Sequence, residues 1–161
     1  MQSLRHFATR HARAYEVVYN GSSPIILAFI RLMKKLFGDR LDGAFTWAEK
    51  QSKELLFDCR MCGNCVLSST GMTCPMNCPK TIRNGPCGGV RANGHCEVKP
   101  EMKCVWVEAW SGSRKMKNSH EIEIIQFAPN NKHKGTSAWI RLAEQKQAEK
   151  EQARIADGGQ S

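Results

Sequence analysis

Residues 59–104 read CRMCGNCVLSSTGMTCPMNCPKTIRNGPCGGVRANGHCEVKPEMKC and contain all eight cysteines of the 161-residue chain. The same stretch holds six of the 13 glycines and four of the six prolines, and it contains no Phe, Trp or Tyr. A segment of this composition buries too little apolar surface to offset the entropy lost on ordering it. The eight thiols are therefore the groups expected to order it, and the fold is expected to form around them.

The spacing of the thiols favours an iron–sulfur site. Cys59, Cys62 and Cys65 form a Cys-x2-Cys-x2-Cys run, which ferredoxins complete with a cysteine followed by proline. Both Cys74 and Cys78 are followed by proline, although their spacing is not that of ferredoxins. Eight thiolates suffice for two four-iron clusters, and one arrangement places the first three on one cluster with a later thiol. The predicted ligands are Cys59, Cys62, Cys65, Cys74, Cys78, Cys87, Cys96 and Cys104.

Zinc and disulfides are the alternatives. Two four-cysteine zinc sites would also use eight thiolates, but such sites show paired Cys-x2-Cys elements and the chain has no second pair. Disulfides are favoured in exported proteins, and the first 20 residues lack the apolar core of a signal peptide. A reducing, cytoplasmic setting is therefore expected, in which clustered cysteines favour a metal.

Length and charge exclude several classes of function. A chain of 161 residues is too short for a β/α barrel, which needs roughly 250. The net charge is +9, and it divides evenly between the three thirds of the sequence. Such an even spread, without aromatic residues among the cysteines, argues against nucleic-acid binding. The longest uncharged apolar run, residues 24–30, is too short for a membrane span. No catalytic residues are predicted, because no nucleophile and base form a recognisable pattern.

The periodicity outside the cysteine segment predicts a small α-rich fold with little β structure, in which helices flank the metal-binding segment. Helices are expected at 9–19 and 24–37, with a break at Asn20-Gly21, and from Asp42 or Ala44 to Leu56. Residues 105–110 form a helix or strand, 111–120 a basic linker and 121–127 a β segment. A last helix, capped by Thr136 or Ser137, continues into a charged tail that is disordered after Asp157.

Apolar stripes on the two long helices predict their buried faces. The expected inner positions are Ile26, Phe29, Ile30, Met33 and Phe37 on the first, and Phe45, Ala48, Ser52 and Leu55, widened by Trp47 and Leu56, on the second. The expected organisation is an N-terminal helical segment (1–57), a cysteine-rich metal segment (58–110), a linker with a β segment and closing helix (111–143), and a charged helical or disordered tail (144–161).

Three motifs carry a family resemblance. They are Cys59-Arg-Met-Cys62-Gly-Asn-Cys65, Cys74-Pro-Met-Asn-Cys78-Pro and Arg83-Asn-Gly-Pro-Cys87-Gly-Gly89. Together they resemble the methylenetetrahydrofolate reductase C-terminal domain family. Lys134-Gly-Thr-Ser-Ala-Trp139 is similar to the closing element of that family, with Ala138 in place of a serine. The resemblance covers about residues 45–142.

The resemblance implies a role in one-carbon metabolism. Members occur fused to, or as a separate small subunit beside, a flavin-containing barrel that reduces methylenetetrahydrofolate, as in the acetogen enzyme. The implied function is that of a non-catalytic iron–sulfur subunit that relays electrons to or from the flavin of the partner, with a further electron-donor protein as a possible second partner. The alternatives are a zinc-stabilised interaction module, docked on a reductase or methyltransferase, and a purely structural subunit. Candidate docking residues are Trp106, Trp110, Trp139, Phe29, Met33 and Phe37, unless they pack internally.

Overall fold

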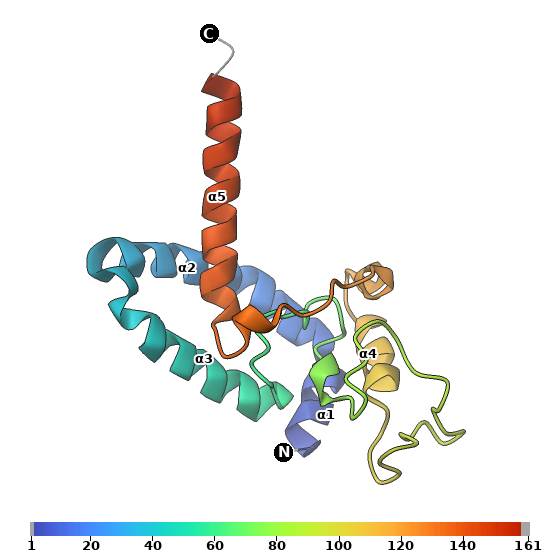
Figure 1. The fold of residues 1–161 in the computed structure, drawn as a ribbon. Coiled ribbons are helices and arrows are strands. Elements are labelled where there is room, and N and C mark those ends of the chain that lie inside the picture. Colours follow the sequence, from blue (N-terminus) through green and yellow to red (C-terminus); the bar gives the residue numbers. More distant parts are fainter. Residues whose placement is uncertain (1, 159–161) are drawn as a thin grey trace.

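The computed structural model describes the backbone of residues 2–158 and the side chains of residues 4–153. The described chain is α-rich, as predicted, and its only β pairing is an isolated antiparallel bridge between His95 and Lys103. The described residues form five α-helices. They are α1 (Gln2–Arg10), α2 (Ala12–Phe37), α3 (Asp42–Phe57), α4 (Val105–Ser113) and α5 (Ala138–Gly158). Long irregular segments connect α3 to α4 and α4 to α5 (Figure 1).

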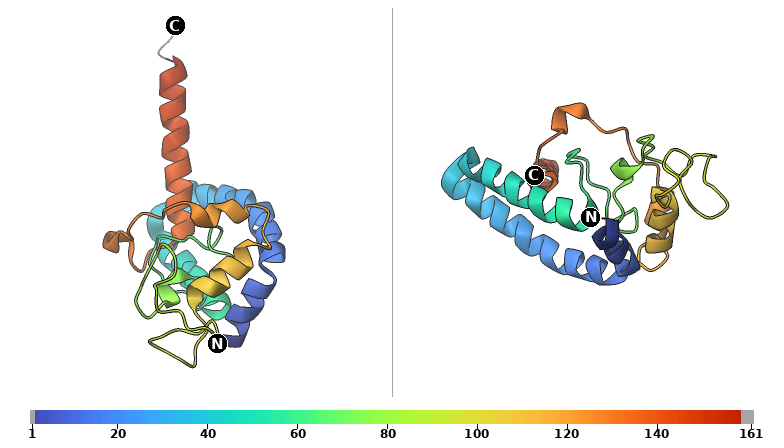
Figure 2. Two further views of the ribbon diagram at one scale, coloured as in Figure 1. Left: turned by 90° about the vertical axis from the view of Figure 1, so that its right-hand side faces the viewer. Right: turned by 90° about the horizontal axis from the view of Figure 1, so that it is seen from below.

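The helices border the first part of the cysteine-rich segment. Helices α2 and α3 diverge from the short 3-10 turn Gly38–Leu41 that joins them, while α1 and α4 lie at the opposite end (Figures 1 and 2). The first part of α5 packs on α2, and the rest projects away from the body. Gly38 ends α2 with a φ of 60°, which glycine adopts without the steric cost of a side chain. The loops that follow α3 lie among the helices, whereas the yellow-green loops before α4 project beyond it (Figure 1).

The apolar core is divided into small clusters. One cluster joins Ala8 and Ala12 to Phe57 and to the loop residues Leu67 and Met72. A second joins Leu27 and Ile30 of α2 to Ile140 and Ala143 of α5. Because each cluster is small, polar contacts contribute much of the order of the loops.

The predicted break in the first long helix is wrong. Helix α2 runs without interruption through Asn20-Gly21 and carries Pro24 in its interior. Proline removes only its own N–H, and the carbonyl of Asn20 that loses its partner lies on an exposed side of the helix, where water can bind it. Packing of Ala12 on one side of the proline and Leu27 on the other holds both halves in one helix.

The predicted inner faces of the helices are only partly right. On α2, Leu27 and Ile30 are buried, but Phe29 and Phe37 are each about half exposed. The second helix was correctly predicted, yet its buried side is centred on Glu49 and Phe57, whereas the predicted positions Trp47, Ala48, Ser52 and Leu55 are exposed. The reason is that α3 faces the cysteine loop with a buried ion pair, which an apolar pattern does not reveal.

The predicted β segment at 121–127 does not form. The structure has a 3-10 turn, Ser119–Glu123, followed by an extended loop whose backbone bonds to Arg83 and Asn84 instead of to a strand. Residues 105–110 are helical, and α4 extends to Ser113 into the predicted linker. The last helix begins as predicted, with Ser137 Oγ accepting the N–H of Ile140 at 3.1 Å. Residue 158 is still helical, and residues 159–161, predicted to be disordered, lie outside the described part.

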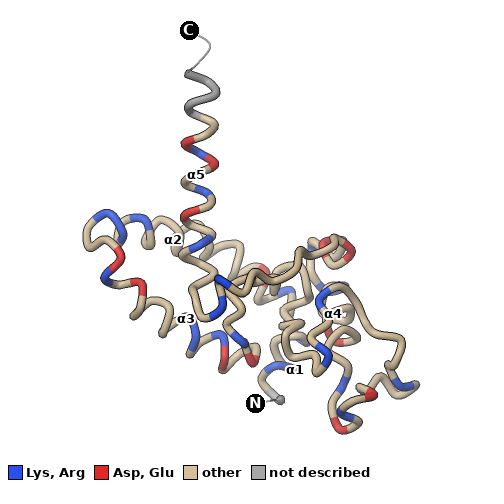
Figure 3. Tube along the Cα trace, in the orientation of Figure 1, with Lys and Arg blue, Asp and Glu red and all other residues tan. Residues whose placement is uncertain are grey.

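The charges are spread over the described chain as the sequence predicts. Figure 3 shows Lys and Arg interspersed with Asp and Glu on the helices and loops. Over the described residues, no helix combines the length and the apolar character that a membrane span requires.

A buried carboxylate connects α2 to the loop after α4. Glu16 is 4% exposed and accepts the backbone N–H groups of Lys117 at 2.8 Å and Asn118 at 3.2 Å, and it pairs with Arg13 at 3.0 Å. Burial alone would raise the pKa of Glu16, but these donors outweigh it and lower the pKa. The charged form of Glu16 is therefore the form that stabilises the fold.

Replacing Glu16 by glutamine is expected to lower the free energy of unfolding at pH 7 by about 1–3 kcal/mol, since the amide NH2 group takes the place of one carboxylate oxygen and faces a backbone N–H as a second donor. Because the folded pKa lies below the unfolded one, this contribution is present above the unfolded pKa and is lost as pH falls through the folded pKa. Urea unfolding should therefore show a smaller difference in unfolding free energy between the wild-type protein and Glu16→Gln at pH 3 than at pH 7. Glu149→Gln, on the exposed part of α5, is the control. An equal loss of unfolding free energy in both variants would contradict a stabilising role for the Glu16 carboxylate.

Candidate metal centre

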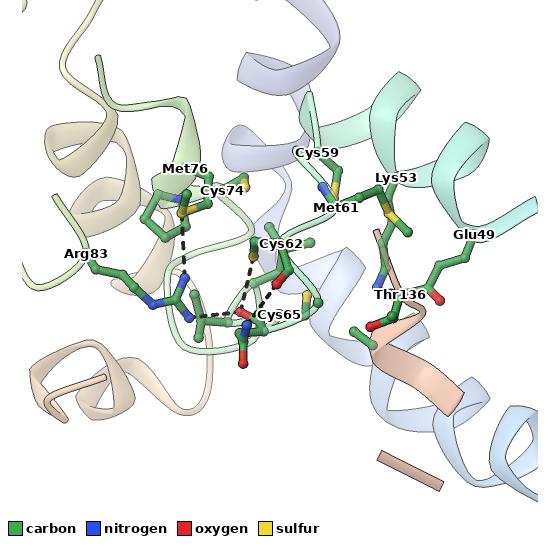
Figure 4. Close-up of a pocket in the computed structure, with 16 residues that line it drawn as sticks. Glu49, Lys53, Cys59, Met61, Cys62, Cys65, Cys74, Met76, Arg83 and Thr136 are labelled. Atoms are coloured by element: carbon green, nitrogen blue, oxygen red, sulfur yellow. Dashed lines mark hydrogen bonds and ion pairs between the residues drawn. The ribbon is translucent and has the colours of Figure 1, made fainter. Parts of the chain in front are cut away.

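Four of the eight cysteines line one cavity. Cys59, Cys62 and Cys65 come from the loop that follows α3, and Cys74 precedes the 3-10 turn Pro75–Asn77. The cavity is small, with a volume of about 20 Å³, and Figure 4 shows the four side chains around it. The sequence predicted that the first three thiols act together with a later one, and the structure places Cys74 beside them.

The backbone of this loop depends on left-handed residues and on a clamp from a distant segment. Asp58 ends α3 with a φ of 51°, and Gly63 has a φ of 70°. A Cβ on Gly63 would collide with the backbone carbonyl of His133, so only glycine permits the approach. The N–H of Gly135 donates to the carbonyl of Met61 at 2.7 Å. The segment before α5 therefore holds the Cys-x2-Cys-x2-Cys loop in place.

The thiols of this group differ in exposure and in acidity. Cys74 is buried, at 7% exposed, whereas Cys65 is exposed to solvent. Burial, assisted by the neighbouring Cys59, raises the pKa of Cys74 to about 12. Burial also raises the pKa of Cys59. These two thiols are protonated at neutral pH, so binding of a metal as thiolates must release protons.

Two cations, the partly buried Lys53 and the buried Arg83, line the same cavity. Lys53 of α3 forms an ion pair with Glu49 at 2.5 Å, and Glu49 also accepts a hydrogen bond from Ser137. Arg83 lies on the other side, where its guanidinium donates to the carbonyl of Asn64 at 2.8 Å. Figure 4 shows Lys53 and Glu49 on one side of the cysteines and Arg83 on the other. Two positively charged side chains thus line the same cavity as the four thiols.

The other four cysteines lie on the loops before α4. Cys78 packs against the apolar cluster that contains Cys96, and the Sγ of Cys87 lies 3.7 Å from an Oε of Glu97, the residue after Cys96. The pKa of Lys80 is raised chiefly by its hydrogen bond to Glu97, with Cys87 and Cys96 contributing. Cys104 begins α4, and its N–H bonds to Gly94 at 2.9 Å. These contacts place Cys78 beside Cys96 and Cys87 beside Glu97, while Cys104 packs in a separate cluster with Trp106 and Ala109.

The donor set fits a thiolate-bound group, although the thiols are not arranged around a single ion. All eight cysteines are free thiols in the structure. Among the residues with described side chains, no three His, Cys, Asp or Glu groups stand close enough to hold a metal ion. Binding would therefore have to draw each group of thiols together, as occurs where metal binding supplies part of the folding free energy.

The predicted aromatic docking residues have different environments. Trp106 is buried and its Nε1 donates to the carbonyl of Ile82 at 3.0 Å. Trp139 packs on Tyr19, with ring centroids 5.1 Å apart. Trp110 is 49% exposed and lines a groove of about 310 Å³ together with Val107 and Pro86. Only Trp110 among the three tryptophans is thus left with a largely open surface.

Comparison with known proteins yields one family. A family model described as "Methylene-tetrahydrofolate reductase C terminal" matches residues 39–133. No curated protein and no solved structure matches the chain. The matched region is more than half of the chain and includes all eight cysteines, Arg83, α3 and α4, whereas α1, α2 and α5 lie outside it. The chain therefore belongs to the methylenetetrahydrofolate reductase C-terminal family.

Proposed function

We propose that this chain is the non-catalytic iron–sulfur subunit of a methylenetetrahydrofolate reductase, which relays electrons to or from the flavin of a separate barrel subunit. The observation that carries the proposal is the cavity lined by Cys59, Cys62, Cys65 and Cys74 within a member of this family. The second group, Cys78, Cys87, Cys96 and Cys104, would hold the other four-iron cluster. The free state of all eight thiols favours a reducing compartment, the cytoplasm.

The spacing of the cysteines in the sequence favours a cluster over zinc. Zinc sites with four cysteines show paired Cys-x2-Cys elements, and the chain has no second pair. The Cys-x2-Cys-x2-Cys run of Cys59, Cys62 and Cys65, with a Cys-Pro at Cys74, is instead typical of iron–sulfur proteins.

The residues of this chain would hold and shield the clusters, whereas the clusters, when bound, supply one-electron transfer. Cys74 is buried and Cys59 is partly buried, so that side of the first site excludes water. Cys65 is exposed between Tyr19, Trp139 and Lys53 and marks the open side. Electron exchange with another protein is expected where a ligand is exposed, because transfer depends on close approach.

The experiment that tests the relay uses protein purified without oxygen. The chain, reduced with dithionite and freed of excess reductant, is mixed with the oxidised flavoprotein reductase. We expect the visible absorbance of the flavin to be lost as that of the clusters recovers. Intact clusters that never reduce the flavin would leave only a structural role, and a colourless protein with zinc would indicate an interaction module.

The groove at Trp110 is the proposed docking site for the reductase. It lies inside the matched region, beside the loop of Cys87, and combines the exposed Val107 and Trp110 with Gly85 and Pro86. A partner common to the family is expected to contact residues of the shared region. Large aromatic residues set into a groove are also the residues that dominate binding energy at interfaces.

Replacing Trp110 by alanine is expected to weaken binding to the reductase by about 30-fold or more, the size of effect seen at such anchor residues. The dissociation constant can be measured by titration calorimetry under nitrogen. Trp47→Ala is the matched control, because Trp47 is 65% exposed on α3 and lies outside the groove. Equal affinities of the two variants would rule out this docking site.

A further inference from the structure

Arg83 is a buried cation whose charge is not balanced. It is 9% exposed, and its guanidinium donates to the carbonyls of Asn64 at 2.8 Å and Phe127 at 3.2 Å and contacts the sulfur of Met76 at 3.8 Å. All three acceptors are uncharged. Within the described part of the chain, Arg83 takes part in no ion pair.

The buried Arg5 and the partly buried Lys53 are both paired. Arg5 contacts Glu108 at 3.3 Å, and Lys53 contacts Glu49 at 2.5 Å. A buried charge is costly unless an opposite charge lies close to it, so Arg83 is the exception. Its hydrogen bonds satisfy the donors of the guanidinium but leave the net charge in place.

The cavity that Arg83 lines contains groups that can supply the opposite charge. The same cavity is lined by Cys59, Cys62, Cys65 and Cys74, which become negatively charged when they bind a metal group. Figure 4 shows Arg83 on the side of the cavity opposite Lys53 and Glu49. Because Glu49 already neutralises the charge of Lys53, Arg83 is the residue lining the cavity whose positive charge is available to a negatively charged group.

We propose that Arg83 is the counter-ion of the cluster held by Cys59, Cys62, Cys65 and Cys74 and that it raises the reduction potential of this cluster. The inference rests on the proposed function. Reduction adds one electron and therefore one negative charge, without making or breaking a bond to the protein. A fixed positive charge stabilises the reduced form more than the oxidised form, and net charge is one of the features that set cluster potentials.

A purely structural role for Arg83 predicts different behaviour. Its hydrogen bonds join the cysteine loop at Asn64 to the extended segment at Phe127, so the side chain also holds two segments together. Loss of that connection would disturb cluster assembly whatever the charge of the replacement. The charge and the hydrogen bonds can therefore be separated by comparing neutral replacements with lysine.

The test measures the potentials of both clusters by dithionite titration monitored by electron paramagnetic resonance. The variants are Arg83→Met and Arg83→Gln, which remove the charge, and Arg83→Lys, which keeps it. Arg60→Met is the matched control, because Arg60 adjoins Cys59 in sequence but is exposed and pairs with Asp58 at 3.6 Å. Both neutral variants are expected to lower the potential of one cluster only, the one that is lost when Cys62 is replaced, while the Lys variant and the control retain both potentials.

The other outcomes are also decisive. An unchanged potential in the neutral variants would overturn the proposal, and so would loss of the cluster from all three Arg83 variants, because lysine keeps the charge. Loss of the cluster from the neutral variants alone would support a requirement for the charge. Wild-type protein that binds no cluster would instead refute the proposed function itself, and the proposal for Arg83 with it.

Discussion

Replacement of Cys62 by serine is expected to remove one of two clusters and to leave the other intact. Serine is a poor ligand for iron, and Cys62 shares its cavity with only three other cysteines. Iron and sulfide in protein isolated without oxygen should therefore fall from about eight of each per chain to about four. The reciprocal variant Cys87→Ser, in the second group, should lose the other cluster and show the same halved content.

Double variants test the grouping itself. Cys62→Ser combined with Cys65→Ser is expected to keep about four iron atoms, because both ligands belong to the same four-iron cluster. Cys62→Ser combined with Cys87→Ser should retain none. If the first double variant were empty while each single variant kept half of its iron, the assignment of Cys62 and Cys65 to one site would be wrong.

Removing the charge of Arg5 is expected to cause the largest loss of stability among single changes outside the cysteines. Arg5 of α1 is 2% exposed and contacts the carboxylate of Glu108 of α4, which is 7% exposed and also contacts His6. Arg5→Met leaves the carboxylate of Glu108 buried without its main counter-ion, at a cost of about 3–5 kcal/mol. The measurement is the free energy of unfolding of the cluster-loaded protein in urea.

Two further variants make this prediction specific. Arg10→Met, at the exposed end of the same helix, should change the unfolding free energy by no more than about 0.5 kcal/mol. The double variant Arg5→Met/Glu108→Leu should recover much of the loss, because replacing both members of a buried pair by apolar residues is often nearly neutral. A double variant as unstable as Arg5→Met would show that packing, and not the unpaired carboxylate, is responsible.

The parts of the fold that could be predicted are those governed by local sequence. Helix α3 and the start of α5 at Ser137 follow from apolar spacing and a capping hydroxyl, and the irregular cysteine segment follows from its glycines, prolines and lack of aromatic residues. The break expected at Asn20-Gly21 does not occur, because packing on both sides of Pro24 outweighs local preference. The strand expected at 121–127 does not form, because no neighbouring strand is present among the described residues to pair with it.

The candidate site was only partly visible in the sequence. The eight ligands and the grouping of Cys59, Cys62 and Cys65 could be proposed from spacing, but the addition of Cys74 required the structure. The buried polar residues around the cavity were missed, since burial of a charge depends on contacts between distant segments. Glu49 and Lys53 are four residues apart on one helix, and this spacing is the local signal for their ion pair. The sequence around Arg83 contains no comparable signal for its burial.

The most direct test of the central claim is the metal and sulfide content of the full chain, purified without oxygen, together with its visible spectrum. We expect a brown protein with about eight iron and eight sulfide per chain, whose colour bleaches on reduction with dithionite. A colourless protein with about two zinc ions and no sulfide would contradict it, because zinc accepts and donates no electrons.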